Sequence, residues 1–225
     1  MSAGQASLRP LAVRSGLAAL GVVGASIVLI GALHAPWARP LLMRLGGCPI
    51  ESDPLVIERA QREGAHARRG DQPSPTRVVH GFHLGEDGPS EVEAWASAHG
   101  AQCTAHREGL WLGCTNVSGT AIGMQGALER LDFTFRSGDR RLVSVTAYQQ
   151  APDLTANAAS FEAARAELRA ALGEPSFHGG APGGTEAYAT ATVAYRYSDL
   201  VVDLTTTRIP SRGSSVFQSI VLATD

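Results

Sequence analysis

A long uncharged apolar run near the N-terminus constrains this chain more than any other feature. Residues 15–38 contain no Asp, Glu, Lys or Arg, and most of them are aliphatic or small. About 20 such residues span the hydrocarbon core of a bilayer. Arg9 and Arg14 precede the run with no acidic residue before them, and Trp37 lies where an interfacial aromatic belongs. We predict a transmembrane helix over residues 15–37, after a short N-terminus of residues 1–14.

A cleavable secretory signal peptide is the alternative interpretation of this run. Its apolar region is shorter, about 7 to 15 residues, and a small-residue cleavage site of the A-x-A type follows it. No clean site of that type follows here. Cleavage would leave a soluble periplasmic or secreted protein, such as an inhibitor or a chaperone, instead of a single-pass membrane protein.

The charge composition excludes a nucleic-acid-binding role. The chain has 19 basic and 21 acidic residues, so it carries no basic field for a phosphate backbone. Every basic side chain is arginine, and lysine is absent. Together with heavy alanine and glycine usage, this composition is typical of a GC-rich bacterial genome.

Cys48 lies just past the apolar run, in the segment "LGGC". This segment resembles the lipobox of bacterial lipoproteins, but Arg39, Pro40 and Arg44 separate it from the apolar run. Lipidation of Cys48, a free thiol and an intermolecular disulfide therefore remain open. We assign residues 38–76 to a juxtamembrane helix, which starts at Asp53-Pro54, and a turn-rich linker "GDQPSP".

The remaining residues, 77–225, predict an α+β domain of two helix-plus-antiparallel-sheet halves, about 77–150 and 151–225. The first half has a strand over 77–85, a helix that starts with the Ser90–Glu93 capping box, and two hairpins. In the second half, a helix begins near Asn157, and its apolar stripe ends before Gly173. Three strands follow, and we expect the two halves to pack together or to share a sheet.

Cys103 and Cys114 flank a predicted two-residue turn at Glu108-Gly109. That turn places the two cysteines directly opposite each other, with Cβ atoms about 4.5–5.5 Å apart, close to disulfide geometry. With a two-residue turn, Cys103 and Cys114 form a hydrogen-bonded pair, which is the wider of the two kinds of antiparallel pair. Either the disulfide is then strained, or the turn is longer and keeps the same register. Unpaired thiols and a metal site are the alternatives. A metal ion would need about four suitable ligands, and His106 lies on the opposite strand face from Cys103.

A structural disulfide belongs outside a reducing cytosol, and one that closes so short a loop contributes roughly 3 kcal/mol. We therefore place the domain in the periplasm and the N-terminus in the cytoplasm, with the helix in the inner membrane. The same strand pattern puts Trp111 and His106 on the face opposite the cysteines. If the cysteine face is the core, they are candidate contacts for a partner protein. The alternatives are that the hairpin packs on both faces or that Trp111 is the buried residue.

The helix, the turn "LGEP" (Leu172–Pro175) and the three strands that follow resemble two known modules. These are the module of small periplasmic outer-membrane-assembly lipoproteins and the β-lactamase inhibitor protein fold. The resemblance covers roughly residues 157–223, with an echo in 90–149. It implies a binding or scaffolding role and no active site, and we carry over no functional residue.

No catalytic or metal-binding motif emerges from the sequence. The seven histidines show no H-x-x-x-H or H-E-x-x-H spacing, and no G-x-S-x-G occurs. Tyr195 and Tyr197 share one strand face beside Arg196, either as a peptide groove or as sheet-on-helix core. We predict no catalytic residue, no metal and no cofactor, and expect a membrane-anchored envelope module that binds a protein partner. An enzyme with an unrecognised site remains a further alternative.

Overall fold

Ten β-strands and three α-helices make up the part of the chain that the computed structural model describes, residues 54–210 and 213–223. The helices are α3 (Pro54–Arg68), α4 (Pro89–Ala98) and α5 (Leu154–Leu172). The strands are β1 (Val78–Val79), β2 (Phe82–His83), β3 (Gln102–His106), β4 (Trp111–Thr115), β5 (Arg130–Phe135), β6 (Leu142–Ala151), β7 (Phe177–Gly179), β8 (Thr190–Arg196), β9 (Leu200–Ile209) and β10 (Gly213–Leu222). The protein is therefore α+β, as predicted. Residues 15–37 and Cys48 lie outside the described residues. Among the helices of the described residues, none is long and apolar enough to cross a membrane.

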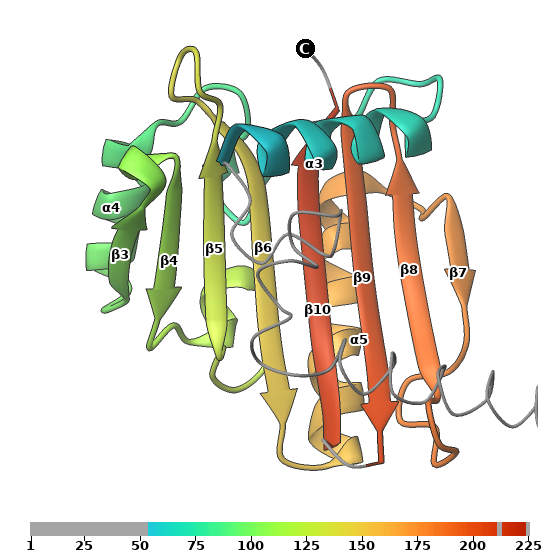
Figure 1. The fold of residues 1–225 in the computed structure, drawn as a ribbon. Helices are drawn as coiled ribbons and strands as arrows, with labels where there is room; N and C mark the ends of the chain where they lie inside the picture. The colour runs from blue at the N-terminus through green and yellow to red at the C-terminus, as the bar shows by residue number, and fades with distance from the viewer. Residues whose placement is uncertain (1–53, 211–212, 224–225) are drawn as a thin grey trace, which may run out of the picture. The chain divides into compact units, whose positions relative to one another are not determined.

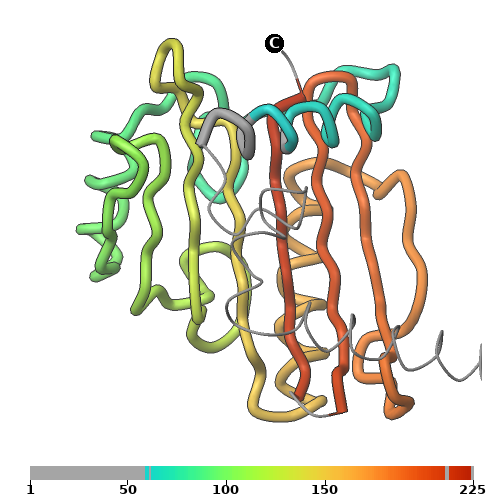
Figure 2. Tube along the Cα trace, viewed as in Figure 1, coloured from blue at the N-terminus to red at the C-terminus, as the bar shows by residue number. Residues whose placement is uncertain are grey.

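The two predicted halves share one antiparallel sheet of eight strands, in the order β3-β4-β5-β6-β10-β9-β8-β7 (Figure 1). Each half supplies one helix and the four strands that follow it, α4 with β3–β6 and α5 with β7–β10. The halves meet through their last strands, because β6 pairs with β10 at the centre. The chain trace in Figure 2 shows this arrangement, with the first half on one side of the sheet centre and the second half on the other.

Helix α5 covers one face of the sheet and forms the main core with it. Phe161, Ala164, Leu168 and Leu172 recur at helical spacing, and all four are buried. Alternate residues of the strands meet them from the sheet. The principal ones are Leu131, Phe133, Val145, Ala147, Val193, Tyr195, Val202, Leu204, Val216 and Ile220. This confirms the apolar stripe predicted for the second helix.

Helix α3 lies across one end of the opposite face, over β9 and β10 (Figure 1). Ala65 packs there with Val201, Val221 and Ala223 in a small second core. The Arg68 guanidinium pairs with the Asp203 carboxylate of β9. The predicted juxtamembrane helix thus forms at the predicted start, Pro54, and packs on the sheet.

The segment after α3 is also fixed to the sheet. The amide of Gly70 donates to the carbonyl of Tyr197 (3.2 Å), and the amide of Ser198 donates to the carbonyl of Gln72 (2.7 Å). Asp199 accepts hydrogen bonds from Ser74 and Arg77. The compact unit consequently spans Asp53–Asp225, and starts earlier than the residue 77 expected from the turn-rich composition of the linker.

Three local elements differ from the sequence prediction. Residues 77–85 form the tight hairpin β1–β2 instead of one strand, because His80 and Gly81 both adopt positive φ, as a two-residue I′ turn requires. Helix α4 begins at Pro89 with Gly88 as N-cap, where proline suits the first helical position. Helix α5 begins at Leu154, because Asp153 caps it by accepting from the amide of Ala156 (2.8 Å).

The β3–β4 hairpin has the predicted register and a longer turn. Cys103 lies opposite Cys114, and the last pair is His106 with Trp111. The turn is therefore residues 107–110, in which Arg107, Glu108 and Gly109 have positive φ. The Cα atoms of the two cysteines are 4.0 Å apart and their sulfur atoms lie at disulfide distance. This separation is typical of a narrow, non-hydrogen-bonded pair. Of the two alternatives from the sequence, a strained disulfide or a longer turn, the structure therefore has the longer turn.

Candidate functional site

The sheet surface opposite α5, which we call the open face, is the candidate functional site. Alternation along the strands places there the residues that the α5 core does not take up. Strand register arranges many of them in three rows across the sheet. The rows are Arg130-Tyr148-Phe217-Thr205-Thr192, then Thr104-Gly113-Asp132-Thr146-Ser219-Asp203-Ala194-Phe177, then His106-Trp111-Thr134-Ser144-Val221-Val201-Arg196. Among the described residues, α3 covers the last row at Val221 and Val201 and leaves the first row uncovered.

The composition of the open face suits a contact surface. Threonine and serine dominate it, and Phe177 and Phe217 are large apolar side chains that stay 57% and 41% exposed. Aromatic and β-branched residues on a half-covered sheet provide rigid contact area at low entropic cost. This face therefore differs from the α5 face, which is apolar and closed.

Trp111 and His106 lie together on this face at its β3–β4 end, as the strand pattern predicted. The two rings form a cross-strand pair with centroids 4.6 Å apart. The guanidinium carbons of Arg107 and Arg130 lie 5.6 Å and 5.8 Å from the centre of the Trp111 ring, within reach of a cation–π interaction. The indole is half-buried among these groups, so it is held in place and still reachable from solvent.

Asp132 is the buried charge of the open face, with 8% of its surface exposed. One carboxylate oxygen accepts from Nε of Arg130 at 2.6 Å, and the other oxygen has no hydrogen-bond partner among the described residues. Burial raises the pKa of Asp132, and the Arg130 guanidinium opposes that rise. Because Arg130 also faces the Trp111 ring, one arginine connects the tryptophan to the buried carboxylate.

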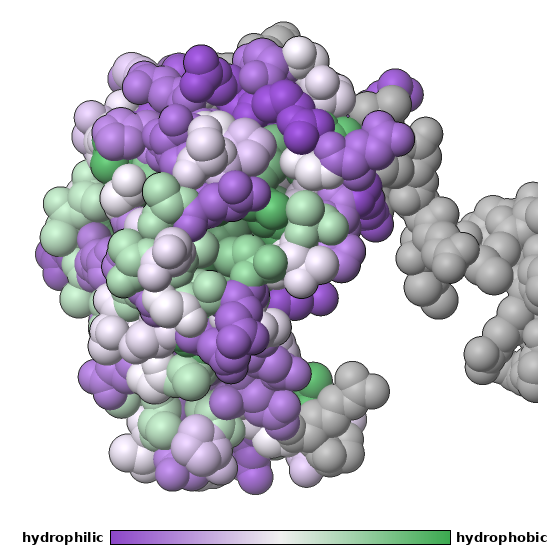
Figure 3. Space-filling model, turned by 90° about the vertical axis from the view of Figure 1, so that its left-hand side faces the viewer, coloured by the Kyte–Doolittle hydropathy of each residue, from purple (hydrophilic) through white to green (hydrophobic). Residues whose placement is uncertain are grey.

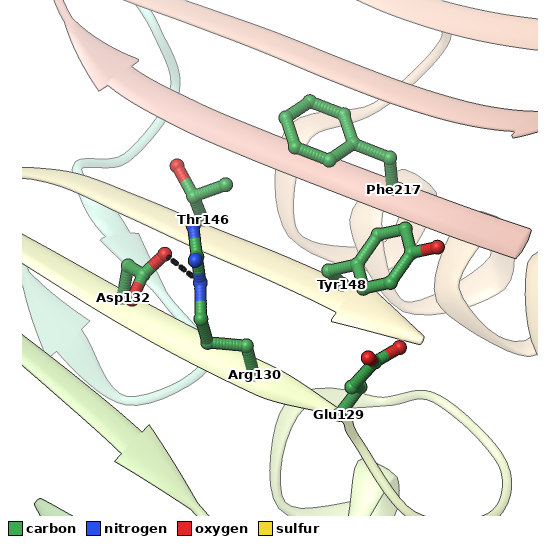
Figure 4. Close-up of a pocket in the computed structure, with 6 residues that line it drawn as sticks. All are labelled: Glu129, Arg130, Asp132, Thr146, Tyr148 and Phe217. Carbon is green, nitrogen blue, oxygen red and sulfur yellow. Dashed lines mark ion pairs between the residues drawn. The ribbon is translucent and has the colours of Figure 1, made fainter. Parts of the chain in front are cut away.

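A shallow pocket of about 410 Å³ opens beside this ion pair (Figure 4). The rings of Tyr148 and Phe217 lie next to each other on paired strands and form its apolar side. Arg130 and Asp132 form the charged side, and the remaining lining residues are Thr146 and Glu129. The pocket thus offers aromatic surface beside charges of both signs, which suits a side chain of a partner better than a chemical reaction.

Tyr195 and Tyr197 lie on the other side of the sheet from Trp111. Tyr195 is completely buried against α5, and burial raises its pKa to about 12. The hydroxyl of Tyr197 donates to the carbonyl of Leu172 at the end of α5, and burial raises the pKa of this tyrosine too. Of the two sequence interpretations, both side chains fit sheet-on-helix core, and Tyr195 offers no surface to a partner.

A second polar cluster, around His80, lies between α5 and the sheet. The His80 side chain is fully buried, with Nδ1 2.6 Å from the Glu167 carboxylate and Nε2 2.8 Å from the Gln218 amide nitrogen. The hydrogen bond from His80 lowers the pKa of Glu167. This histidine–carboxylate pair anchors the β1–β2 hairpin to α5. The imidazole of this pair is buried, whereas 41% of the Glu167 side chain is exposed.

The sequence did not point to Asp132, Tyr148 or Phe217 as site residues. Each lies on a different strand, and the site forms only because β6 pairs with β10 across the two halves. The alternation of polar and apolar residues in β6 and β10 was a usable signal for the face, but not for the neighbours of each residue. In the described ranges 54–210 and 213–223, no group of three or more His, Cys, Asp or Glu is placed to hold a metal ion.

Comparisons of the chain with protein-family models, with curated proteins and with solved structures found no match.

Proposed function

We propose that this protein is a membrane-anchored, extracytoplasmic binding or scaffolding module of the bacterial envelope, and that its open face contacts a protein partner. The observation that carries this proposal is the row Arg130, Tyr148 and Phe217, which presents aromatic and charged groups that the described part of the chain leaves uncovered.

The proposed location rests on the sequence and on the cysteine pair. The apolar residues 15–37 would anchor the chain, and Arg9 and Arg14 would keep its N-terminus in the cytoplasm. Cys103 and Cys114, with sulfur atoms at disulfide distance, suit an oxidising compartment such as the periplasm. The resemblance of the helix, turn and sheet module to envelope lipoproteins and to an inhibitor fold supports a role in binding.

The proposed contact follows from how binding energy concentrates at interfaces. Tryptophan, tyrosine and arginine are enriched among residues whose truncation costs a complex the most. Trp111, Arg130 and Tyr148 are grouped around the buried carboxylate of Asp132, which makes them the expected centre of the interface. The threonine-rich surface around them would form its polar rim.

Site-specific photo-cross-linking tests the contact. A photo-reactive phenylalanine analogue is placed at Phe217 on the open face, or at Glu162 on the solvent side of α5, in the full chain in bacterial membranes. We expect a discrete cross-linked protein from position 217 and none from position 162, and we expect Trp111→Ala to reduce the yield. Equal products from both positions, or none from position 217, would contradict the proposal.

Membrane extraction and peptide mapping test the location. An anchored protein stays with carbonate-washed membranes, and its N-terminal peptide is found by mass spectrometry. Linked Cys103 and Cys114 in non-reducing maps would support a periplasmic domain. Two free thiols with an intact anchor would refute that placement, and a soluble protein lacking the apolar run would identify a cleaved signal.

A further inference from the structure

Strand β3 is one of the two outer strands of the sheet, and its outer edge is free within the described part of the chain. Its only strand neighbour there is β4. Four of its five residues are exposed, and Cys103 is half-buried. Figure 3 views the side of the molecule where β3 and α4 lie, and an apolar area appears there between polar surroundings.

The spacing of the hairpin determines which backbone groups face outward. Cys103 and Cys114 have Cα atoms 4.0 Å apart, so they form a narrow pair that exchanges no backbone hydrogen bonds. The amide and carbonyl of Cys103 therefore point away from β4. Because strands repeat every two residues, those of Ala105 do so as well. The backbone groups of Thr104 point toward β4 instead.

This edge lacks the devices that usually block strand addition. Natural sheets protect their edges with proline, charged side chains, bulges or a covering element. Residues 102–105 are Gln, Cys, Thr and Ala, and their register with β4 is continuous from Gln102 to His106. The free edge is therefore regular and uncharged, and it is suited to pair with another extended segment.

A hollow of about 350 Å³ lies beside the edge, between β3 and α4. Five of its lining residues are small or apolar, and two are acidic or polar. They are Ala96, Ala101, Cys103, Ala105 and Leu112, with Glu93 and Ser97. The side chains of Cys103 and Ala105 lie on the side of the sheet that faces the hollow. In a strand added next to β3, every second side chain would project to the same side and reach the hollow.

We propose that the outer edge of β3 is a strand-addition site for an extended segment of a partner polypeptide. The segment carries a large aliphatic side chain, which fills the hollow, and a basic residue next to Glu93. Hydrogen bonds to the outward groups of Cys103 and Ala105 hold its backbone. A second copy of this chain fits less well, because it would bring its own Cys103 and Ala105 to the hollow and leave it unfilled. The proposal does not rest on the proposed function, since it uses the outward backbone groups of β3 and the hollow on the α4 side of the sheet.

Peptide binding to the full chain in detergent micelles tests this site. The probe is a short fluorescein-labelled peptide in which leucine alternates with threonine between terminal lysines, and the control peptide has serine in place of leucine. Fluorescence anisotropy measures both dissociation constants. We expect the leucine peptide to bind about tenfold or more tightly than the serine peptide, because only leucine fills the hollow.

Three variants at the edge separate the two parts of the site. Ala105→Pro removes an outward amide that has no partner in the sheet, so the fold is kept. Ala105→Phe keeps the amide and fills the hollow. Both should weaken binding of the leucine peptide by about tenfold, whereas Thr104→Ala, which changes only the other face, should change it by less than about twofold. Unchanged binding in both Ala105 variants would overturn the proposal.

Amide hydrogen exchange of the unmodified chain gives a readout that does not depend on variants. The leucine peptide should slow exchange at Cys103 and Ala105 and leave Thr104, which already donates to β4, unchanged. Absence of protection at both positions would overturn the site. If the chain instead dimerises without peptide and Ala105→Pro abolishes the dimer, the occupant is a second copy and the proposed partner is wrong.

Discussion

Replacing Asp199 by asparagine measures how firmly the segment after α3 is held against the sheet. The Asp199 carboxylate accepts from the amide of Ser74 at 2.8 Å, from the Ser74 hydroxyl at 3.1 Å and from Nε of Arg77 at 2.8 Å. Hydrogen bonds to a charged group contribute about 1.5–3 kcal/mol each. Arg77 is half exposed, so solvent screens its share, and asparagine keeps one acceptor oxygen. We expect Asp199→Asn to lower the free energy of unfolding by about 1–2 kcal/mol at pH 7.

The pH dependence of this loss tests the charge itself. Burial would raise the pKa of Asp199, but the hydrogen bonds from Arg77 and Ser74 outweigh it and hold the pKa below its ordinary value. The stabilisation by the charge is therefore complete above about pH 4, the ordinary pKa of an unfolded Asp. It is lost as the pH falls through the lower folded pKa, because the carboxyl then binds a proton in both states.

Urea unfolding of the full chain in detergent micelles, followed by tryptophan fluorescence, provides the assay. The difference between wild type and Asp199→Asn should stay constant from about pH 8 to 5 and shrink below about pH 4. Asp139→Asn is the matched control, because its carboxylate is 47% exposed and its nearest Arg136 nitrogen lies 3.3 Å away, and it should cost less than about 0.5 kcal/mol. Equal losses of unfolding free energy in both variants would refute the reasoning. So would a difference between wild type and Asp199→Asn that stays the same below about pH 4.

The same unfolding assay checks three further changes. Leu168→Ala, in the fully buried stripe of α5, should cost about 2–5 kcal/mol, and a cost below about 1 kcal/mol would mean that this helix does not close the core. Double replacement of Cys103 and Cys114 by serine should cost roughly 3 kcal/mol under oxidising conditions and show no added loss under reduction, provided that the disulfide forms. Glu167→Gln should cost about 1 kcal/mol at pH 7 through its bond to buried His80, because solvent screens a carboxylate that is 41% exposed. This cost should decline as the pH falls through the lowered pKa of Glu167.

Local patterns predicted the elements, while contacts between distant segments decided the rest. The stripe of Phe161, Ala164 and Leu168 can be predicted from the sequence because its spacing matches one helix face. The pairing of Cys103 with Cys114 can be predicted because a short turn allows few registers between its two strands. These features depend only on residues close together in the chain.

The docking of α3 was not predictable in the same way. Its sequence signals a helix start at Pro54 but does not reveal a partner. Among the α3 residues whose side chains are described, Ala65 is the one that is buried in the small second core. The turn-rich segment after it resembles a linker because its stabilising contacts, above all Ser74 with Asp199, are made with residues far along the chain. The composition of this segment indicates a turn, but it does not indicate which distant residues the turn contacts.

The open-face site shows the same limit more strongly. Asp132 and Tyr148 belong to neighbouring strands of one hairpin, so their proximity is derivable from local register. Phe217 joins them only through the central pairing of the two halves, for which the sequence offers several alternatives. The buried state of Asp132 is a further surprise, because an acidic residue in an alternating strand is expected to face water.

The central position of β10 has a consequence for how the chain reaches its native state. Among the described strands it comes last in the chain, yet it lies between β6 and β9 in the middle of the sheet. Until β10 has been synthesised, the edge of β6 that pairs with it stays unpaired. Strand β9 also lacks the strand that joins it to the first half of the sheet. Contacts so distant in sequence slow folding and leave intermediates prone to aggregation. We therefore expect a nascent chain of this protein to need a chaperone during synthesis until β10 has been released.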